Sequence, residues 1–139
     1  MRLLIDSPII LDFLLHRDPF MRDAEALVDA ISSGLIVGYV TASTLSDIFT
    51  IALKHTHSTD RAKEAVALVL AMMEICPVNR AALELALTST NAHLDDAIQN
   101  ASAITQGLDA IVTRDRTFTN PLIPVLSVAE ALDRLDDGA

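Results

Sequence analysis

Short apolar runs of this chain alternate with longer segments in which apolar residues recur at helical spacing. A short apolar run is typical of a buried strand, and helical spacing is typical of a helix with one face on a core. The runs predicted as strands cover residues 3–6, 35–40, 75–78, 110–113 and 124–126. Strands that alternate with helices in this way form a mostly parallel sheet. The sequence therefore predicts an α/β fold with three α/β/α layers.

Residues that favour helix ends mark where the helical segments begin and stop. Ser7 before Pro8 is a typical start, a hydroxyl cap followed by proline at the first helical position. Asn79 is another expected cap, and residues 127–130 (SVAE) form a capping box. Gly107 is expected to end the helix before it. The predicted helices cover residues 8–15, 20–33, 41 or 43 to 54, 60–73, 79–87, 94–106 and 127–135.

The size and charge of the chain limit its function classes. Its 139 residues are predicted to form one domain, 1–139, with a substantial core. Because 51% of the residues are hydrophobic, intrinsic disorder is not expected. The formal net charge of −9 argues against non-specific nucleic-acid binding over a broad surface. The charge does not exclude a nuclease, because an acidic metal site itself contributes several negative charges.

The compartment is predicted from three features. Cys76 is the only cysteine, so no internal disulfide can form and a reducing cytoplasm is expected. Asp6 and Asp12 interrupt the region where a signal peptide needs an apolar core. The longest apolar run, residues 65–73, is too short to cross a bilayer. We therefore expect a cytoplasmic protein without a membrane partner.

Four aspartates lie beside apolar segments. Asp6 and Asp115 follow predicted strands, and open α/β sheets place their sites at the carboxyl ends of strands. Asp47 lies on a predicted helix, and Asp96 lies in the first turn of another. Gathered carboxylates repel one another, and a hard divalent cation such as Mg²⁺ or Mn²⁺ offsets that repulsion. The pattern favours one acidic cleft in a metal-dependent enzyme that acts on phosphates.

Several of these acids also have a purely structural interpretation. Asp96 and its neighbour Asp95 would favour the dipole of a helix that begins there. Asp115 would suit an ordinary turn. Any one of these signals is weak, and the order of all four acids is much more informative. Asp12 and Asp95 are expected nearer the rim of the cleft or the surface.

Four segments together resemble the PIN-domain family, which includes metal-dependent ribonucleases and VapC-type toxins. Residues 3–12 (LLIDSPIILD) are similar to the family's opening of an apolar strand, an acidic motif and an apolar helix. Residues 41–48 (TASTLSDI), 95–101 (DDAIQNA) and 110–115 (AIVTRD) are similar to its later acidic segments. The resemblance covers nearly the whole chain and implies a PIN-like domain. The family's catalytic acids would fall on Asp6, Asp47, Asp96 and Asp115.

The resemblance implies an endoribonuclease that uses Mg²⁺ or Mn²⁺ to hydrolyse phosphodiester bonds of single-stranded or structured RNA. The expected metal ligands are Asp6, Asp96 and Asp115, and the expected RNA contacts are Ser7, Arg114 and Arg116. For the two arginines, solvated loop charges are an equally good interpretation. The resemblance also implies a toxin with an antitoxin protein as partner, and a homodimer. The apolar character of predicted helices 20–33 and 60–73 agrees with self-association. Filling the core is an equally good interpretation of the second helix.

Two departures from the family pattern favour an alternative. Pro8 replaces the usual asparagine, which removes a polar side chain beside the metal, and Asp47 replaces the commoner glutamate. The alternative is a catalytically weak or inactive PIN-like module that binds RNA or protein without cutting. A receiver-type domain built around Asp6 is disfavoured, because such domains use a lysine late in the chain and the only lysines here are Lys54 and Lys63.

Overall fold

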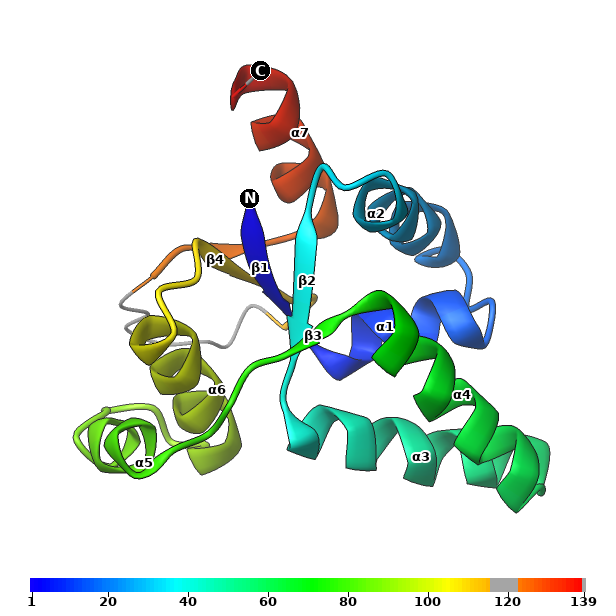
Figure 1. Ribbon diagram of the computed structural model, residues 1–139, viewed down its shortest axis with the longest axis horizontal. Coiled ribbons are helices and arrows are strands. Elements are labelled where there is room, and N and C mark those ends of the chain that lie inside the picture. The colour runs from blue at the N-terminus through cyan, green and yellow to red at the C-terminus, as the bar shows by residue number, and fades with distance from the viewer. Residues whose placement is uncertain (116–122, 139) are drawn as a thin grey trace.

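The structure is a computed structural model that describes residues 1–115 and 123–138, in which five strands form one sheet (Figure 1). The strands are β1 (Arg2–Ile5), β2 (Val37–Val40), β3 (Glu74–Ile75), β4 (Ala110–Val112) and β5 (Val125–Leu126). Their order in the sheet is β3-β2-β1-β4-β5, and every pairing is parallel. The predicted parallel α/β fold is therefore confirmed.

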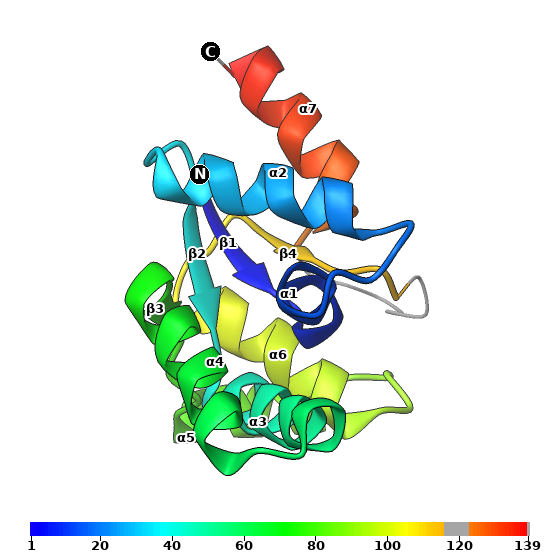
Figure 2. The same ribbon diagram turned by 90° about the vertical axis from the view of Figure 1, so that its right-hand side faces the viewer.

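Helices connect the strands and cover both faces of the sheet. They are α1 (Ser7–Leu14), α2 (Met21–Ser32), α3 (Ala42–Thr56), α4 (Thr59–Met72), α5 (Arg80–Leu87), α6 (Leu94–Thr105) and α7 (Val128–Gly138). Figure 1 shows α5 and α6 on one side of the sheet and α1 to α4 on the other. Figure 2, seen from the side of α1 and α2, places α6 behind the strands. None of the helices in the described segments combines the length and hydropathy that crossing a membrane requires.

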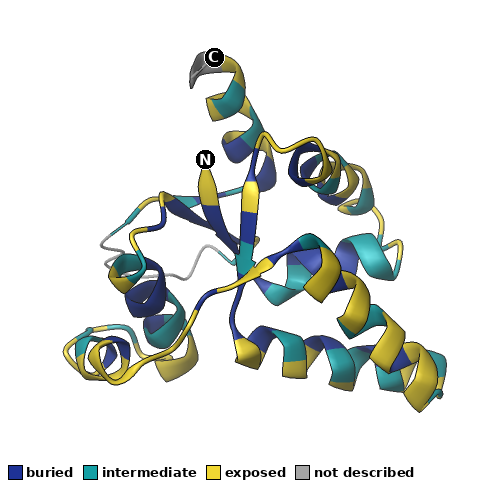
Figure 3. Cartoon of the chain, viewed as in Figure 1, coloured by how far each residue is buried: buried dark blue, intermediate teal, exposed yellow. Residues whose placement is uncertain are grey.

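Strand β1 supplies side chains to the cores on both faces of the sheet. Leu3 and Ile5 belong to a large buried cluster with residues of α1, α2, α3, α4 and α7. Leu4 points the other way and packs in a smaller cluster with Ala103 of α6. This alternation follows from the two-residue period of a strand. Figure 3 shows the buried residues gathered on the strands and on the inner sides of the helices, which makes three layers.

Several predicted boundaries were wrong. Strand β3 covers only Glu74–Ile75 instead of residues 75–78, because Pro77 has no N–H to extend the ladder. Strand β2 begins at Val37 instead of residue 35. Helix α3 continues to Thr56, where His57 adopts a left-handed conformation (φ 55°) and ends it. Helix α4 begins at Thr59 because the hydroxyl of Ser58 caps it.

The start of α1 also differs from the prediction and bears on the site. Asp6, not Ser7, is the N-cap residue, and Ser7 is already in the helix. The Asp6 Oδ1 atom accepts a hydrogen bond from the Ser7 backbone N–H at 2.9 Å. Because the positive end of the helix dipole lies at this terminus, it stabilises a negative charge on Asp6.

Candidate active site

The candidate site lies where the direction of chain winding changes across the sheet. Strand β1 pairs with β2 on one side and with β4 on the other. In open α/β sheets, such a switch between two strands leaves a crevice at their carboxyl ends. Asp6 follows β1 and Thr113 follows β4, so both enter this crevice from adjacent strands.

Besides its cap on α1, Asp6 is held in place by contacts from α6 and from the end of β4. Its Oδ2 atom accepts a hydrogen bond of 2.7 Å from the hydroxyl of Thr113, after β4. Its Oδ1 atom also accepts a long contact of 3.5 Å from the amide of Gln99 on α6. The Asp6 backbone N–H donates to the carbonyl of Val112 at 3.0 Å. With 9% of its surface exposed, Asp6 is a buried carboxylate with a fixed orientation.

The other acids are linked to Asp6 through their charges. Partial burial raises the pKa of the Asp96 carboxyl, and the charges of Asp115, Asp6 and Asp95 raise it further, while His93 lowers it. Partial desolvation also raises the pKa of Asp47, although that residue is largely exposed, and the charges of Asp95 and Asp6 add to the effect. The carboxylates therefore repel one another around Asp6.

The three residues predicted to contact RNA differ in their surroundings. Ser7 lies beside Asp6 and donates its backbone N–H to that carboxylate. The Arg114 guanidinium instead stacks on the Phe20 ring, 3.8 Å from the ring centroid. Its Nη2 atom donates to Asp12 Oδ1 at 3.1 Å. Arg116 lies outside the described residues.

Asp12 was predicted nearer the rim or surface, and this was wrong. Its side chain is 1% exposed and pairs with two arginines. Arg17 Nε donates to Asp12 Oδ1 at 3.0 Å, while Arg114 Nε forms an ion pair with Asp12 Oδ2 at 2.8 Å without hydrogen-bond geometry. This buried cluster ties α1 to the residue that precedes Asp115. Asp95 is exposed, as predicted.

Residues 2–117 match the family model described as PIN domain. The chain belongs to the PIN-domain family. No curated protein matches it in sequence.

Solved structures share this PIN fold at low sequence identity. VapC20 from Mycobacterium tuberculosis, a sarcin-ricin loop cleaving toxin, is 16% identical with a TM-score of 0.68, over 87% of this chain and 95% of that one. A toxin–antitoxin complex from Klebsiella pneumoniae contains a chain that is 20% identical with a TM-score of 0.66, and the match covers 90% of this chain and 96% of that one. FitAcB from Neisseria gonorrhoeae contains a chain that is 15% identical with a TM-score of 0.67, and the match covers 91% of this chain and 98% of that one. At these identities the likeness shows the fold.

The donor atoms of this PIN domain suit a hard divalent cation. Asp6, Asp47 and Asp96 offer oxygen only, and none of them is in an ion pair within the described segments. Desolvation raises the pKa of Asp47 and of Asp96, and repulsion from Asp6 raises both further, which a bound cation would relieve. No three acidic, histidine or cysteine side chains among the described residues are arranged to hold a metal by themselves. Mg²⁺ commonly binds through one or two carboxylates and keeps several waters, so the donor set fits.

Gln99 is a site residue that the sequence interpretation missed. It lies three positions after Asp96, so the two share one face of α6. This spacing within residues 95–101 is the signal that would have identified it. Thr113, which orients Asp6, was likewise considered only as a strand residue.

The raised pKa of Asp47 predicts a pH-dependent effect on stability. A carboxyl with a raised pKa favours the folded state below its ordinary pKa of 3.8, and this contribution is lost as the pH rises through the raised value. At pH 7 the ionised Asp47 therefore destabilises the metal-free protein. We expect Asp47→Asn to raise the melting temperature in EDTA at pH 7, and we expect this gain to shrink as the pH falls toward 4.

The matched control is Asp29→Asn, on the exposed surface of α2, which removes the same charge away from the site. An equal gain in both variants would mean that the effect reflects only the net charge of −9. Thermal unfolding followed by circular dichroism measures both.

Proposed function

We propose that this PIN domain is a metal-dependent endoribonuclease that hydrolyses phosphodiester bonds of single-stranded or structured RNA. The observation that carries the proposal is Asp6 at the switch between β1 and β4. It is oriented by Thr113 and Gln99, and its charge acts on Asp47 and Asp96. Asp6 is buried and has no ion pair within the described segments, and such a charge is costly without a cationic partner, so a bound cation best explains the site.

The proposed roles follow from the environment of each side chain. Asp6, Asp96 and Asp115 would hold Mg²⁺ or Mn²⁺. When bound, such a cation would polarise the scissile phosphate and lower the pKa of a water. Thr113 and Gln99 keep the Asp6 carboxylate in one orientation. Asp47, which is largely exposed, would hold the cation through water or position the attacking water.

RNA would be held beside the acids by the remaining predicted contacts. Ser7 is the first residue of α1, and the N-terminus of a helix favours a bound phosphate. Arg114 is 34% exposed, so it offers phosphate only the part of its guanidinium that Asp12 and Phe20 leave uncovered. We assign Arg116 the same role.

The experiment that tests the proposal is a cleavage assay with purified protein and single-stranded RNA in millimolar Mn²⁺. We expect cuts that EDTA abolishes and that added Mn²⁺ restores. Binding of RNA without cleavage would instead favour the alternative, a PIN-like binding module. Pro8 and Asp47 are the features that favour this alternative.

We also propose that the protein is the toxin of a toxin–antitoxin pair. The support is that the solved structures with this fold include toxins and toxin–antitoxin complexes. Co-expression with the product of an adjacent small gene tests the idea. Formation of a complex that suppresses RNA cleavage supports it, and the absence of any such complex counts against it.

A homodimer is the proposed assembly. The support is that α4 exposes Leu70, which is 49% exposed and lines an apolar groove with Phe49 and Val66. Leu68, which is 44% exposed, lines a second hollow of the same helix. Exposed apolar groups of this kind mark interaction surfaces. Sedimentation showing only a 15.0 kDa species at micromolar concentration would contradict the dimer.

Pro8→Asn is expected to raise cleavage activity or metal affinity roughly 10- to 100-fold, the size typical of groups next to metal ligands. It restores the polar side chain that PIN domains usually carry beside Asp6. The fold should survive, because Arg17 binds the carbonyl of residue 8 and not its side chain. Parallel kinetics and Mn²⁺ titrations of the two proteins measure the effect. Unchanged values would show that this position is indifferent to polarity.

A further inference from the structure

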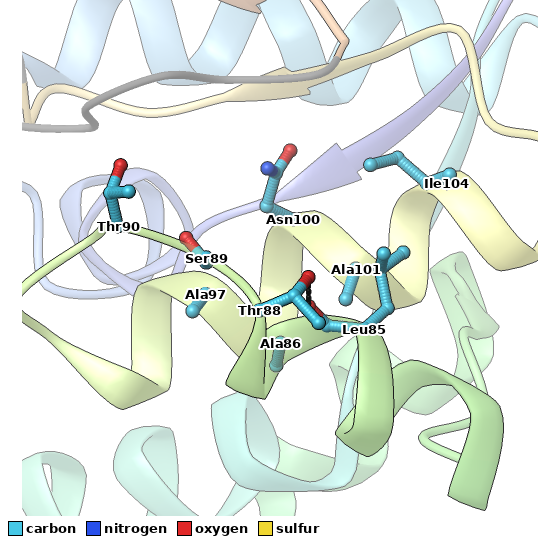
Figure 4. Close-up of a pocket in the computed structure, with 9 residues that line it drawn as sticks. All are labelled: Leu85, Ala86, Thr88, Ser89, Thr90, Ala97, Asn100, Ala101 and Ile104. Atoms are coloured by element: carbon cyan, nitrogen blue, oxygen red, sulfur yellow. Dashed lines mark hydrogen bonds between the residues drawn. The ribbon is translucent and has the colours of Figure 1, made fainter.

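A pocket of about 360 Å³ lies between α5 and α6 (Figure 4). Aliphatic side chains form its walls, including those of Leu85, Ala97 and Ile104. The loop after α5 adds hydroxyl groups, and α6 adds the amide of Asn100. Every described residue that lines the pocket is uncharged, so the pocket suits a neutral group with hydrogen-bonding atoms and not a phosphate.

Asn100 is the polar group of this pocket that lacks a partner. The residue is 8% exposed, and its Oδ1 atom is buried without a hydrogen bond in the described part of the protein. Figure 4 shows its amide projecting from α6 in the same direction as the hydroxyls of Ser89 and Thr90. A buried acceptor without a partner is costly, and a ligand that donates an N–H group would satisfy it. The amide also carries N–H donors, so it can pair with either kind of group.

The position of the pocket connects it to the acids. Asn100 follows Asp96 by four residues, so the two lie on one face of α6, about 6 Å apart along the helix axis. The preceding residue, Gln99, contacts Asp6. A nucleotide whose phosphate lies at the acids would therefore have its base near Asn100.

We propose that this pocket binds the base next to the scissile phosphate and sets the base preference of the enzyme. The inference rests on the proposed ribonuclease function and names the part of the substrate that the site reads. RNA-binding proteins read unpaired bases by hydrogen bonds to their edges and by packing against their faces. Here the Asn100 amide and the Ser89 hydroxyl would contact the base edge, and Leu85 and Ile104 would cover its faces.

Binding without metal tests the pocket separately from catalysis. The four nucleoside 5′-monophosphates are titrated into isotope-labelled protein in EDTA and followed by NMR. We expect one of them to shift the signals of Ser89 and Asn100 most strongly. Asn100→Leu should weaken that binding by roughly 5- to 150-fold, the range expected for a bidentate amide–base contact. The affinities for the other three monophosphates should fall less.

Two further variants control the result. Ser102→Ala removes another buried oxygen of α6 that has no partner among the described residues. Ser102 does not line the pocket, so binding should be unchanged. Ile104→Ala removes part of the pocket wall and should weaken the binding of all four monophosphates equally. Because Ile104 is partly exposed, this variant keeps the test available if Asn100→Leu does not fold.

Cleavage of four RNAs that differ in one base completes the test. Asn100→Leu should reduce the ratio between the best and worst substrates, whereas Ser102→Ala should not. If none of the monophosphates shifts the signals of the pocket residues, the pocket assignment is wrong. It is also wrong if Asn100→Leu still cleaves RNA with an unchanged base preference. Neither result would contradict the proposed ribonuclease activity. Base-selective binding by a protein that cuts no RNA in Mn²⁺ would support the pocket and overturn the ribonuclease.

Discussion

Replacement of Asp6 by asparagine is expected to lower RNA cleavage by more than about 100-fold, beyond the range typical of residues that only support metal ligands. The substitution removes one of the charges that would hold the cation, at the carboxylate that the other acids surround. The fold should persist, because asparagine is as good an N-cap as aspartate. Its amide oxygen can keep the hydrogen bond from the Ser7 N–H, and its amide N–H can donate to the Thr113 hydroxyl, which then accepts instead of donating. Cleavage rates in millimolar Mn²⁺ measure the effect.

Asp29→Asn is the control for Asp6→Asn. It removes one charge from the exposed surface of α2 and should leave cleavage unchanged. Circular dichroism must show that both variants are folded. Cleavage by Asp6→Asn at the rate of the unmodified protein would refute the role of Asp6.

Removal of both arginines around Asp12 is expected to destabilise the fold strongly. Asp12 is 1% exposed, and the described ion pairs to it come from Arg17 and Arg114. A buried charge that loses its partners typically costs about 3–5 kcal/mol. We therefore expect the double variant Arg17→Met, Arg114→Met to lose about that much free energy of unfolding, measured by urea denaturation.

Two related variants show whether the uncompensated charge is the cause. Arg114→Met alone should cost less, because Arg17 still contacts Asp12 at 3.0 Å. Asp12→Asn should also cost less than the double variant, because the two arginines are 34% and 38% exposed and can turn toward water. If Asp12→Asn is as destabilising as the double variant, lost packing and not buried charge explains the effect.

The layers of the fold could be predicted because they depend on local patterns. The apolar runs before Asp6 and Asp115 indicated two strands, and their helical neighbours indicated the parallel connections. The strand-end rule then placed both acids at one edge of the sheet. The cap of α1 was assigned one residue too late, because Asp6 and Ser7 are both good caps and only the observed contact distinguishes them.

The environment of Asp12 could not be predicted from local sequence. Its partner Arg114 is 102 residues away along the chain, and the two meet only because β4 lies next to β1. The same holds for Thr113, which reaches Asp6 across the same pair of strands. Asn100 gave no signal either, since its burial depends on how α5 packs on α6.

Calorimetric titration of Mn²⁺ into the metal-free protein determines whether the acids around Asp6 form a cation site. We expect saturable binding at neutral pH in the unmodified protein, no detectable binding in Asp6→Asn, and unchanged binding in Asp29→Asn. Binding should weaken as the pH falls, because the raised pKa values of Asp47 and Asp96 let protons compete with the cation. No saturable binding up to millimolar Mn²⁺, or equal binding by Asp6→Asn, would contradict the proposed cation site.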